Sequence, residues 1–138
     1  MKKIFIDSDV IVDFLTNRKP FCEHSSKILN LCIDGKIKGH ITPVIISNLY
    51  YVLRKEIGAQ DLRTKIKFLL DYLEIISMNK TIILKALNSD FNDFEDALQN
   101  FTVETNSDIK IILTRNVKDY KKSKLSVYTP QAFLKTIN

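Results

Sequence analysis

The stretch Asn92–Asn100, NDFEDALQN, places three carboxylates within four residues and then continues into apolar residues. On a helix, Asp96 borders the apolar Ala97, so we expect it to be the least solvated of the three acids. Asp93 and Glu95 stand near the start of the same helix, where the helix dipole favours negative charge. Asp96 is therefore a candidate site residue, whereas a helix-start role and a site role are both open for Asp93 and Glu95.

A second group of polar residues follows two apolar, strand-like segments at opposite ends of the chain. Asp7, Ser8 and Asp9 come after the first segment, and Thr114, Arg115, Asn116 and Asp119 come after the second. In parallel sheets, sites form outside the carboxyl ends of the strands. Asp7 could also cap a helix, but Ser8 and Asp9 lie closer to that helix and suit capping better. Its place at a strand end favours a site role for Asp7.

Carboxylates gathered in a dry crevice repel one another unless they are protonated or bridged by cations. Oxygen ligands without histidine or cysteine favour Mg²⁺ or Mn²⁺ over zinc. A magnesium ion held by few carboxylates keeps several waters, which suits attack of water on a phosphodiester. These acids therefore predict metal-dependent hydrolysis.

The chain is basic, with a net charge of +5 and a pI near 9.2. Lysines cluster most densely in KDYKKSK, residues 118–124, which contains Lys118, Lys121 and Lys122. A basic surface favours a polyanionic partner such as nucleic acid, although many basic surfaces serve only solubility. With Arg115, these lysines are the candidate nucleic-acid-binding residues.

Strand-like and helix-like segments alternate along the 138 residues. The predicted strands are 2–7, 38–42, 74–78, 109–114 and 126–129. The predicted helices cover 8–17, 21–35, 43–57, the region around 62–73, 80–90, the stretch from 92 to 101, and 130–137. Thr42, Asn79 and Thr129 suit N-cap positions, and Gly58 suits a helix end. This alternation predicts an α/β fold in one domain, 1–138, with a mainly parallel sheet covered on both faces.

Composition excludes several other classes of protein. No apolar run is long enough to cross a bilayer and the start of the chain does not resemble a secretory signal, so we expect a cytoplasmic protein with no membrane contact. Cys22 and Cys32 lack the spacing of a zinc site, which predicts free thiols. His24 and His40 are isolated, and we expect neither in the site.

The chain resembles the PIN domain family, the metal-dependent ribonuclease fold of VapC-like bacterial toxins. The resemblance rests on four segments in this order: IFIDSDVIVDFL, ISNLYYVLRK, DFEDALQ and IILTRNVKDY. It implies a three-layer α/β/α fold with a five-stranded parallel sheet, whose acids meet at one edge to bind magnesium or manganese. It also implies endonucleolytic cleavage of RNA and, in toxin members, a homodimer and an antitoxin partner.

Carried over by position, Asp7 matches the first acid of the family and Asp96 the third. Asn48 stands where the family usually has a glutamate, and Asn116 where a further aspartate often follows; Asp119 is the nearest carboxylate. Asparagine can ligate a hard cation through its carbonyl oxygen, but it brings no negative charge. The missing charge could come from Asp9, Asp93, Glu95 or Asp119.

Two alternatives remain open from the sequence. A PIN-like domain with two asparagines in acidic positions could bind RNA or a protein partner without cutting. DSDVI, residues 7–11, also partly resembles the opening motif of haloacid-dehalogenase-like phosphatases, but that class needs a larger scaffold.

Overall fold

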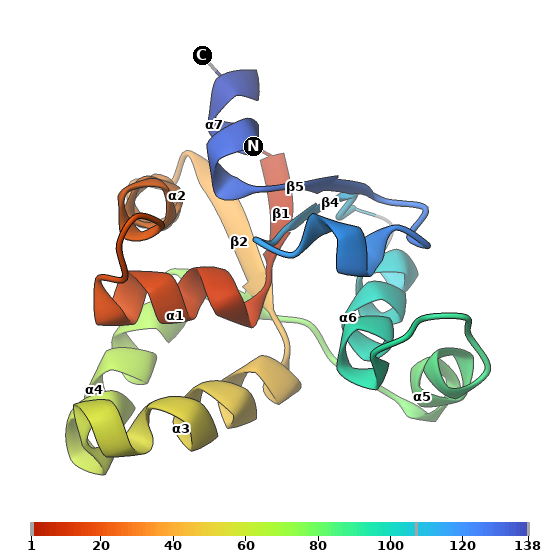
Figure 1. Cartoon of the computed structure of the whole chain (residues 1–138), viewed down its shortest axis with the longest axis horizontal. Coiled ribbons are helices and arrows are strands. Elements are labelled where there is room, and N and C mark those ends of the chain that lie inside the picture. The colour runs from red at the N-terminus through yellow and green to blue at the C-terminus, as the bar shows by residue number, and fades with distance from the viewer. Residues whose placement is uncertain (1, 107, 138) are drawn as a thin grey trace.

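The computed structural model describes residues 2–106 and 108–137. Within these residues, five strands form one sheet in the order β3-β2-β1-β4-β5, and every neighbouring pair is parallel (Figure 1). The strands are β1 (Lys2–Ile6), β2 (Ile37–Ile41), β3 (Leu73–Ile75), β4 (Ile111–Leu113) and β5 (Ser126–Tyr128). This arrangement confirms the predicted α/β class and the parallel sheet.

Helices cover the sheet on both sides, which gives three layers. They are α1 (Ser8–Thr16), α2 (Cys22–Ile33), α3 (Pro43–Ile57), α4 (Ala59–Leu70), α5 (Lys80–Leu87), α6 (Phe94–Thr105) and α7 (Pro130–Thr136), with a short 3₁₀ helix η1 (Val117–Tyr120). In Figure 1, α1, α2 and α7 lie on one side, and α5 and α6 lie on the other. The chain adds β2 and β3 on one side of β1 and then β4 and β5 on the other. The carboxyl ends of β1 and β4 therefore form the switch point where sites are expected.

Three of the predicted helix starts are confirmed by side-chain caps. Thr42 Oγ1 accepts the N–H of Ile45 at 3.3 Å, Asn79 Oδ1 accepts the N–H of Ile82 at 3.0 Å, and Thr129 Oγ1 accepts that of Ala132 at 3.1 Å. These bonds satisfy donors that a helix start leaves free. Gly58, which follows α3, has a φ of 96°, a backbone angle that residues other than glycine rarely adopt.

The structure corrects three expectations. The capping role assigned to Ser8 or Asp9 is wrong, because Asp7 itself is the N-cap of α1. The strands predicted at 74–78 and 109–114 are shorter, with only three residues each in β3 and β4. The segment 117–120, for which no element was predicted, forms η1.

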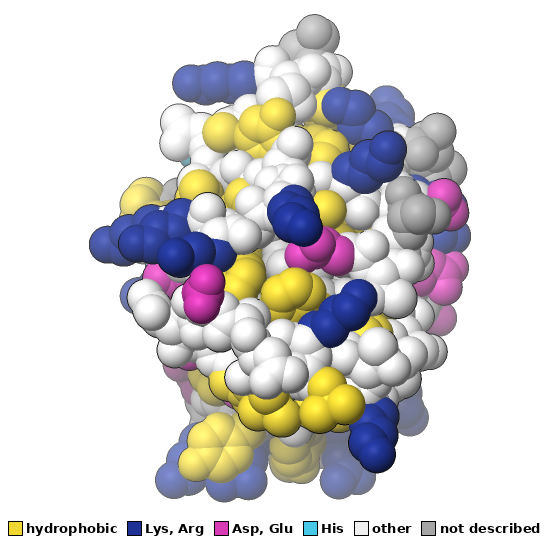
Figure 2. Space-filling model, turned by 90° about the vertical axis from the view of Figure 1, so that its right-hand side faces the viewer, with side chains coloured by type: hydrophobic (Ala, Val, Ile, Leu, Met, Phe, Trp, Pro, Cys, Tyr) yellow, Lys and Arg dark blue, Asp and Glu magenta, His cyan; other side chains and the backbone are white. Residues whose placement is uncertain are grey.

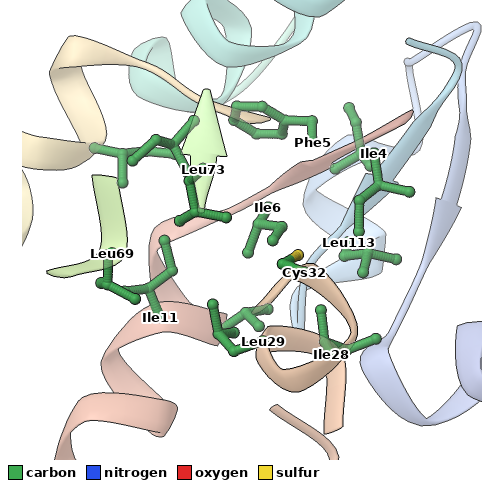
Figure 3. Close-up of a cluster of buried hydrophobic side chains, with 14 of the residues drawn as sticks. Ile4, Phe5, Ile6, Ile11, Ile28, Leu29, Cys32, Leu69, Leu73 and Leu113 are labelled. Carbon is green, nitrogen blue, oxygen red and sulfur yellow. The ribbon is translucent and has the colours of Figure 1, made fainter. Parts of the chain in front are cut away.

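The core surrounds β1, which is buried on both faces. Ile4, Phe5 and Ile6 have no exposed surface, as expected for a central strand of a parallel sheet. Figure 3 shows Ile6 among side chains from α2 and neighbouring elements. In β2, a Cβ at Gly39 would lie 2.6 Å from Leu73 Cδ2 and 2.9 Å from Cys32 Sγ, so only glycine lets these groups meet.

Both cysteines are free thiols, as expected. Burial raises the pKa of Cys32 to about 12, which keeps the thiol protonated. His40 is buried within β2 with its Nδ1 3.1 Å from the carbonyl of Ile4. None of the helices described here combines the length and the apolar character needed to cross a membrane.

Candidate active site

Asp7 lies at the carboxyl end of β1, buried at the switch point. Its Oδ1 accepts the N–H of Ser8 at 2.8 Å, and its Oδ2 accepts the hydroxyls of Thr114 at 3.0 Å and Tyr120 at 3.2 Å. Burial raises the pKa of Asp7, although these three hydrogen bonds oppose the shift; the nearby Glu95 charge also raises it. Asp7 thus has a fixed orientation and a costly buried charge.

Asp9 lies on the first turn of α1, and the loop after β4 holds one of its oxygens. Asp9 Oδ2 accepts Thr114 Oγ1 at 3.2 Å, the N–H of Arg115 at 3.1 Å and Asn116 Nδ2 at 3.2 Å. The other oxygen, Oδ1, is buried and has no hydrogen-bond partner among the described groups. Burial, followed by the charge of Asp7, raises the pKa of Asp9 to about 6.

The three acids at the start of α6 differ in their contacts and in their exposure to solvent. Asp93 is the N-cap of α6, and its Oδ1 accepts the N–H of Asp96 at 3.0 Å. Asp96 is partly buried, whereas Asp93 and Glu95 are exposed, as the helical spacing predicted. Burial and then the charges of Asp7, Asp93 and Asp119 raise the pKa of Asp96 to about 7. Asp96 and Asp7 are therefore close enough to repel each other across the sheet edge.

A cavity of about 200 Å³ opens beside these acids. Both kinds of predicted site residue, the acids and the lysines, line it. Its lining includes the acids Asp90, Asp93, Asp96 and Asp119 and the lysines Lys118, Lys121 and Lys122. On the side of the molecule that carries α5 and α6, basic side chains gather at one edge beside acidic ones, and others are scattered among apolar and uncharged side chains (Figure 2). The cavity thus brings four acids and three lysines together.

Asn48 and Asn116 each donate to a carboxylate. Asn48 Nδ2 on α3 lies 3.1 Å from Glu95 Oε2, and Asn116 Nδ2 lies 3.2 Å from Asp9 Oδ2. Each pair keeps one negative charge at the place where the asparagine supplies none. This is the arrangement expected if Glu95 and Asp9 restore the charge that Asn48 and Asn116 lack.

The donors suit a hard divalent cation, although not as a complete cage. No three carboxylate, histidine or cysteine side chains in residues 2–106 and 108–137 are grouped closely enough to hold an ion unaided. The buried, unpartnered Oδ1 of Asp9 and the raised pKa values of Asp7, Asp9 and Asp96 nevertheless show negative charge that protein groups leave uncompensated. Magnesium is commonly held by one or two carboxylates and several waters, so Asp7 and Asp96 fit such an ion.

Sequence reasoning missed two residues that organise the site. Tyr120, an aromatic residue within a lysine-rich run, is buried and donates to Asp7. Asp13 has no exposed surface and pairs with Arg115, with Nε 2.7 Å from Oδ2. A lone aromatic among lysines and an acid on the apolar side of a helix are the signals that could have identified them. The guanidinium of Arg115 is engaged by Asp13. The contact of Arg115 with nucleic acid remains a prediction.

The sequence model of the PIN domain matches residues 3–118, which include most of β1, all of α6 and β4, and the first two residues of η1. The chain belongs to the PIN domain family. This confirms the family resemblance, and the phosphatase alternative loses its basis because the DSDVI motif lies within the PIN match.

Individual relatives agree with this PIN domain assignment. The chain is 29% identical to "Ribonuclease VapC1" of Aquifex aeolicus (strain VF5) over 142 residues, which cover 99% of this chain and 96% of that protein. Its fold is similar to a toxin–antitoxin complex from Klebsiella pneumoniae, with a TM-score of 0.68 and 19% identity over 92% of this chain and 97% of that one. DNA-bound VapBC from Salmonella typhimurium gives a TM-score of 0.70 and 14% identity, over 94% and 99% of the two chains.

Proposed function

We propose that this PIN domain is a metal-dependent endoribonuclease that cleaves RNA phosphodiester bonds with water. The observation that carries the proposal is the cavity in which Asp93, Asp96 and Asp119 face three lysines, beside the buried Asp7. The similarity to a protein named ribonuclease supports the same reaction. Lysines can hold the phosphate backbone, while the acids can hold a cation at the scissile group.

In this proposal, Mg²⁺ or Mn²⁺ bound by Asp7 and Asp96 would supply an activated water and neutralise charge on the phosphate. Asp93 and Asp119 lie close enough to Asp96 to raise its pKa, so they would add to the negative field that attracts the ion. Thr114 and Tyr120 hold Oδ2 of Asp7 and so fix the direction of the carboxylate. Because the pKa of Asp96 is near 7, a fraction of the protein molecules hold a proton on this carboxyl at neutral pH, and Asp96 would lose that proton when it binds a cation.

The two asparagine–acid pairs suggest roles for Glu95 and Asp9. Glu95 beside Asn48 and Asp9 beside Asn116 would supply charge in the outer part of the site. Ser8 would contribute only its backbone N–H to Asp7. Such outer partners commonly change metal affinity or activity by about 10- to 100-fold.

Cleavage of structured and single-stranded RNA with Mn²⁺ tests the proposal. The purified chain should cut, whereas Asp7→Asn and Asp96→Asn should each cut at least about 100-fold more slowly, because a direct ligand should matter at least as much as its outer partners. Glu56→Gln, which changes an exposed acid on α3, is the matched control and should cut like the wild type. Equal cleavage by all four proteins would identify a contaminating nuclease and refute the proposal.

The alternative function is binding of RNA or a protein partner without cleavage. Asn48 and Asn116 favour it, because each removes a charge that the family usually places near the ion. The alternative predicts no cleavage in the same assay together with RNA binding that weakens steeply as salt rises.

We also propose a protein partner of the antitoxin type, a homodimer and a cytoplasmic place of action. Similar folds occur in toxin–antitoxin complexes, which supports the first. Tyr51 and Val52 on α3 are 72% and 59% exposed, and Leu87 on α5 is 62% exposed, so apolar surface is available for partners. Tyr50 packs against the core instead. Light scattering of the purified chain tests the dimer.

A further inference from the structure

A second cavity, of about 270 Å³, lies where α2 begins, next to the loops that follow β4 and β5. Its lining consists of Phe21, His24, Ser25, Arg115, Thr129, Pro130 and Gln131. Its volume is at the small end for ligand pockets, which suits a compact group better than a large one. None of its residues except Arg115 belongs to the site described above.

One polar group in this cavity lacks a partner. Ser25 is only 1% exposed, and no described group hydrogen-bonds its hydroxyl. A buried hydroxyl without a partner is unfavourable, so its presence calls for a ligand or another explanation. Ser25 is one of the residues that line the cavity, and a hydroxyl can both donate and accept a hydrogen bond.

One wall of the cavity consists of an aromatic ring and an arginine whose charge is paired. The guanidinium of Arg115 lies 4.2 Å from the centre of the Phe21 ring. The same guanidinium is paired with the buried Asp13, through Nε at 2.7 Å and Nη2 at 3.3 Å. Because Asp13 neutralises Arg115, the cavity suits a neutral planar group more than a phosphate.

Arg115 also ties this cavity to the acids. Its backbone N–H donates to Asp9 Oδ2, while its guanidinium lines the cavity. The two places are therefore separated by no more than one arginine side chain. A nucleotide next to the scissile phosphate could reach from one to the other.

We propose that this cavity receives an unstacked base of the RNA substrate, with Phe21 as the stacking surface and Ser25 as a reader of the base edge. The proposal rests on the ribonuclease function proposed above. Single-stranded RNA is commonly recognised by bases that stack on aromatic rings or arginine planes and hydrogen-bond at their edges. The small cavity, the aromatic wall and the free hydroxyl meet these needs.

Binding of short RNA oligomers in EDTA tests the proposal without cleavage. Fluorescence anisotropy should show that Phe21→Ala binds between about fivefold and about a hundredfold more weakly than wild type, as for loss of one stacked base. Phe68→Ala, which removes an exposed ring on α4, is the matched control and should bind like wild type. Equal affinity of the Phe21 variant, the control and the wild type would overturn the proposal.

Ser25→Ala separates recognition from folding. Loss of an unpartnered hydroxyl should not lower the Tm, but it should change the base preference among A, C, G and U oligomers and at the cut sites of a random RNA library. An unchanged preference would refute the role of Ser25 as a reader. If the wild type cuts RNA while Phe21→Ala keeps full affinity, the base pocket fails and the ribonuclease stands. If the folded wild type neither binds nor cuts RNA, both fail.

Discussion

Replacing Asp96 with asparagine should stabilise the metal-free protein at alkaline pH. Asp96 has its pKa raised to about 7 by burial and by the charges of Asp7, Asp93 and Asp119. In the unfolded chain its pKa returns to the ordinary value near 3.8. The folded state therefore pays for ionising this group, and asparagine avoids that cost.

The magnitude follows from the two pKa values. A rise from 3.8 to about 7 corresponds to ~4 kcal/mol for a fully desolvated carboxyl, and screening by water lowers this to ~2 kcal/mol because Asp96 is partly exposed. Asparagine also loses ~0.5 kcal/mol of helix-dipole stabilisation at the start of α6. The net gain of ~1.5 kcal/mol corresponds to a Tm increase of about 6 °C for a domain of this size.

The pH dependence fixes the sign of this effect. Below about pH 4 both the folded and the unfolded chain hold the proton on Asp96, so asparagine gains nothing. The penalty in the wild type grows as pH rises above about 4 and is complete above the folded pKa of about 7. The gain of Asp96→Asn should therefore appear at pH 8 and vanish at pH 4.

Thermal unfolding in EDTA at pH 4 and pH 8 measures this difference, with Glu56→Gln as the control for removing an exposed negative charge. Mn²⁺ should raise the Tm of the wild type at pH 8 and raise that of Asp96→Asn less, because binding to the folded state stabilises it. A lower or unchanged Tm of Asp96→Asn at pH 8 in EDTA would refute the crowding of charge at this site. A gain of equal size at pH 4 would refute its electrostatic origin.

Three further changes test other parts of the molecule. Asn48→Asp puts a second carboxylate beside Glu95, so Mn²⁺ should bind more tightly by calorimetry while the metal-free protein loses ~1 kcal/mol at neutral pH; equal Mn²⁺ affinity would contradict the role of these pairs. Gly39→Ala places a Cβ 2.6 Å from Leu73 Cδ2 and should lower the free energy of unfolding in urea by ~1–3 kcal/mol; full stability would show that β2 and its neighbours can move apart. Lys121→Gln with Lys122→Gln should weaken RNA binding and reduce the slope of log K against log salt by about 1.4, as for two lost phosphate contacts on a single strand; an unchanged slope would place RNA elsewhere.

Local patterns predicted much of the fold because the forces that form its elements act over a few residues. Thr42, Asn79 and Thr129 each cap a helix because their side-chain oxygen accepts a backbone N–H three residues later, so their roles are visible in the sequence. The apolar run before Asp7 likewise predicts a buried strand wherever the chain goes next. The strands β3 and β4 are shorter than predicted. The point at which a strand ends depends on its pairing with a neighbouring strand, and this pairing is not a local property of the sequence.

The sequence singles out the candidate acids Asp7 and Asp96 but not the residues that hold the candidate site together. Asp7 and Asp96 stand out by chemistry and position. Tyr120 does not, because its contact with Asp7 spans 113 residues and depends on how η1 packs. Asp13 is hidden in the same way, since its partner Arg115 lies 102 residues later.

The hydrogen bonds from Thr114 and Tyr120 to Asp7 join the first strand to the final quarter of the chain. During synthesis, Asp7 and Asp96 emerge from the ribosome well before the two hydroxyls that hold Asp7. While Tyr120 is still inside the ribosome, the nascent chain cannot form the hydrogen bond that helps to orient the Asp7 carboxylate. The order of residues along the chain therefore makes the orientation of Asp7 a late event, because the strand that carries this carboxylate is made long before the hydroxyls that hold it.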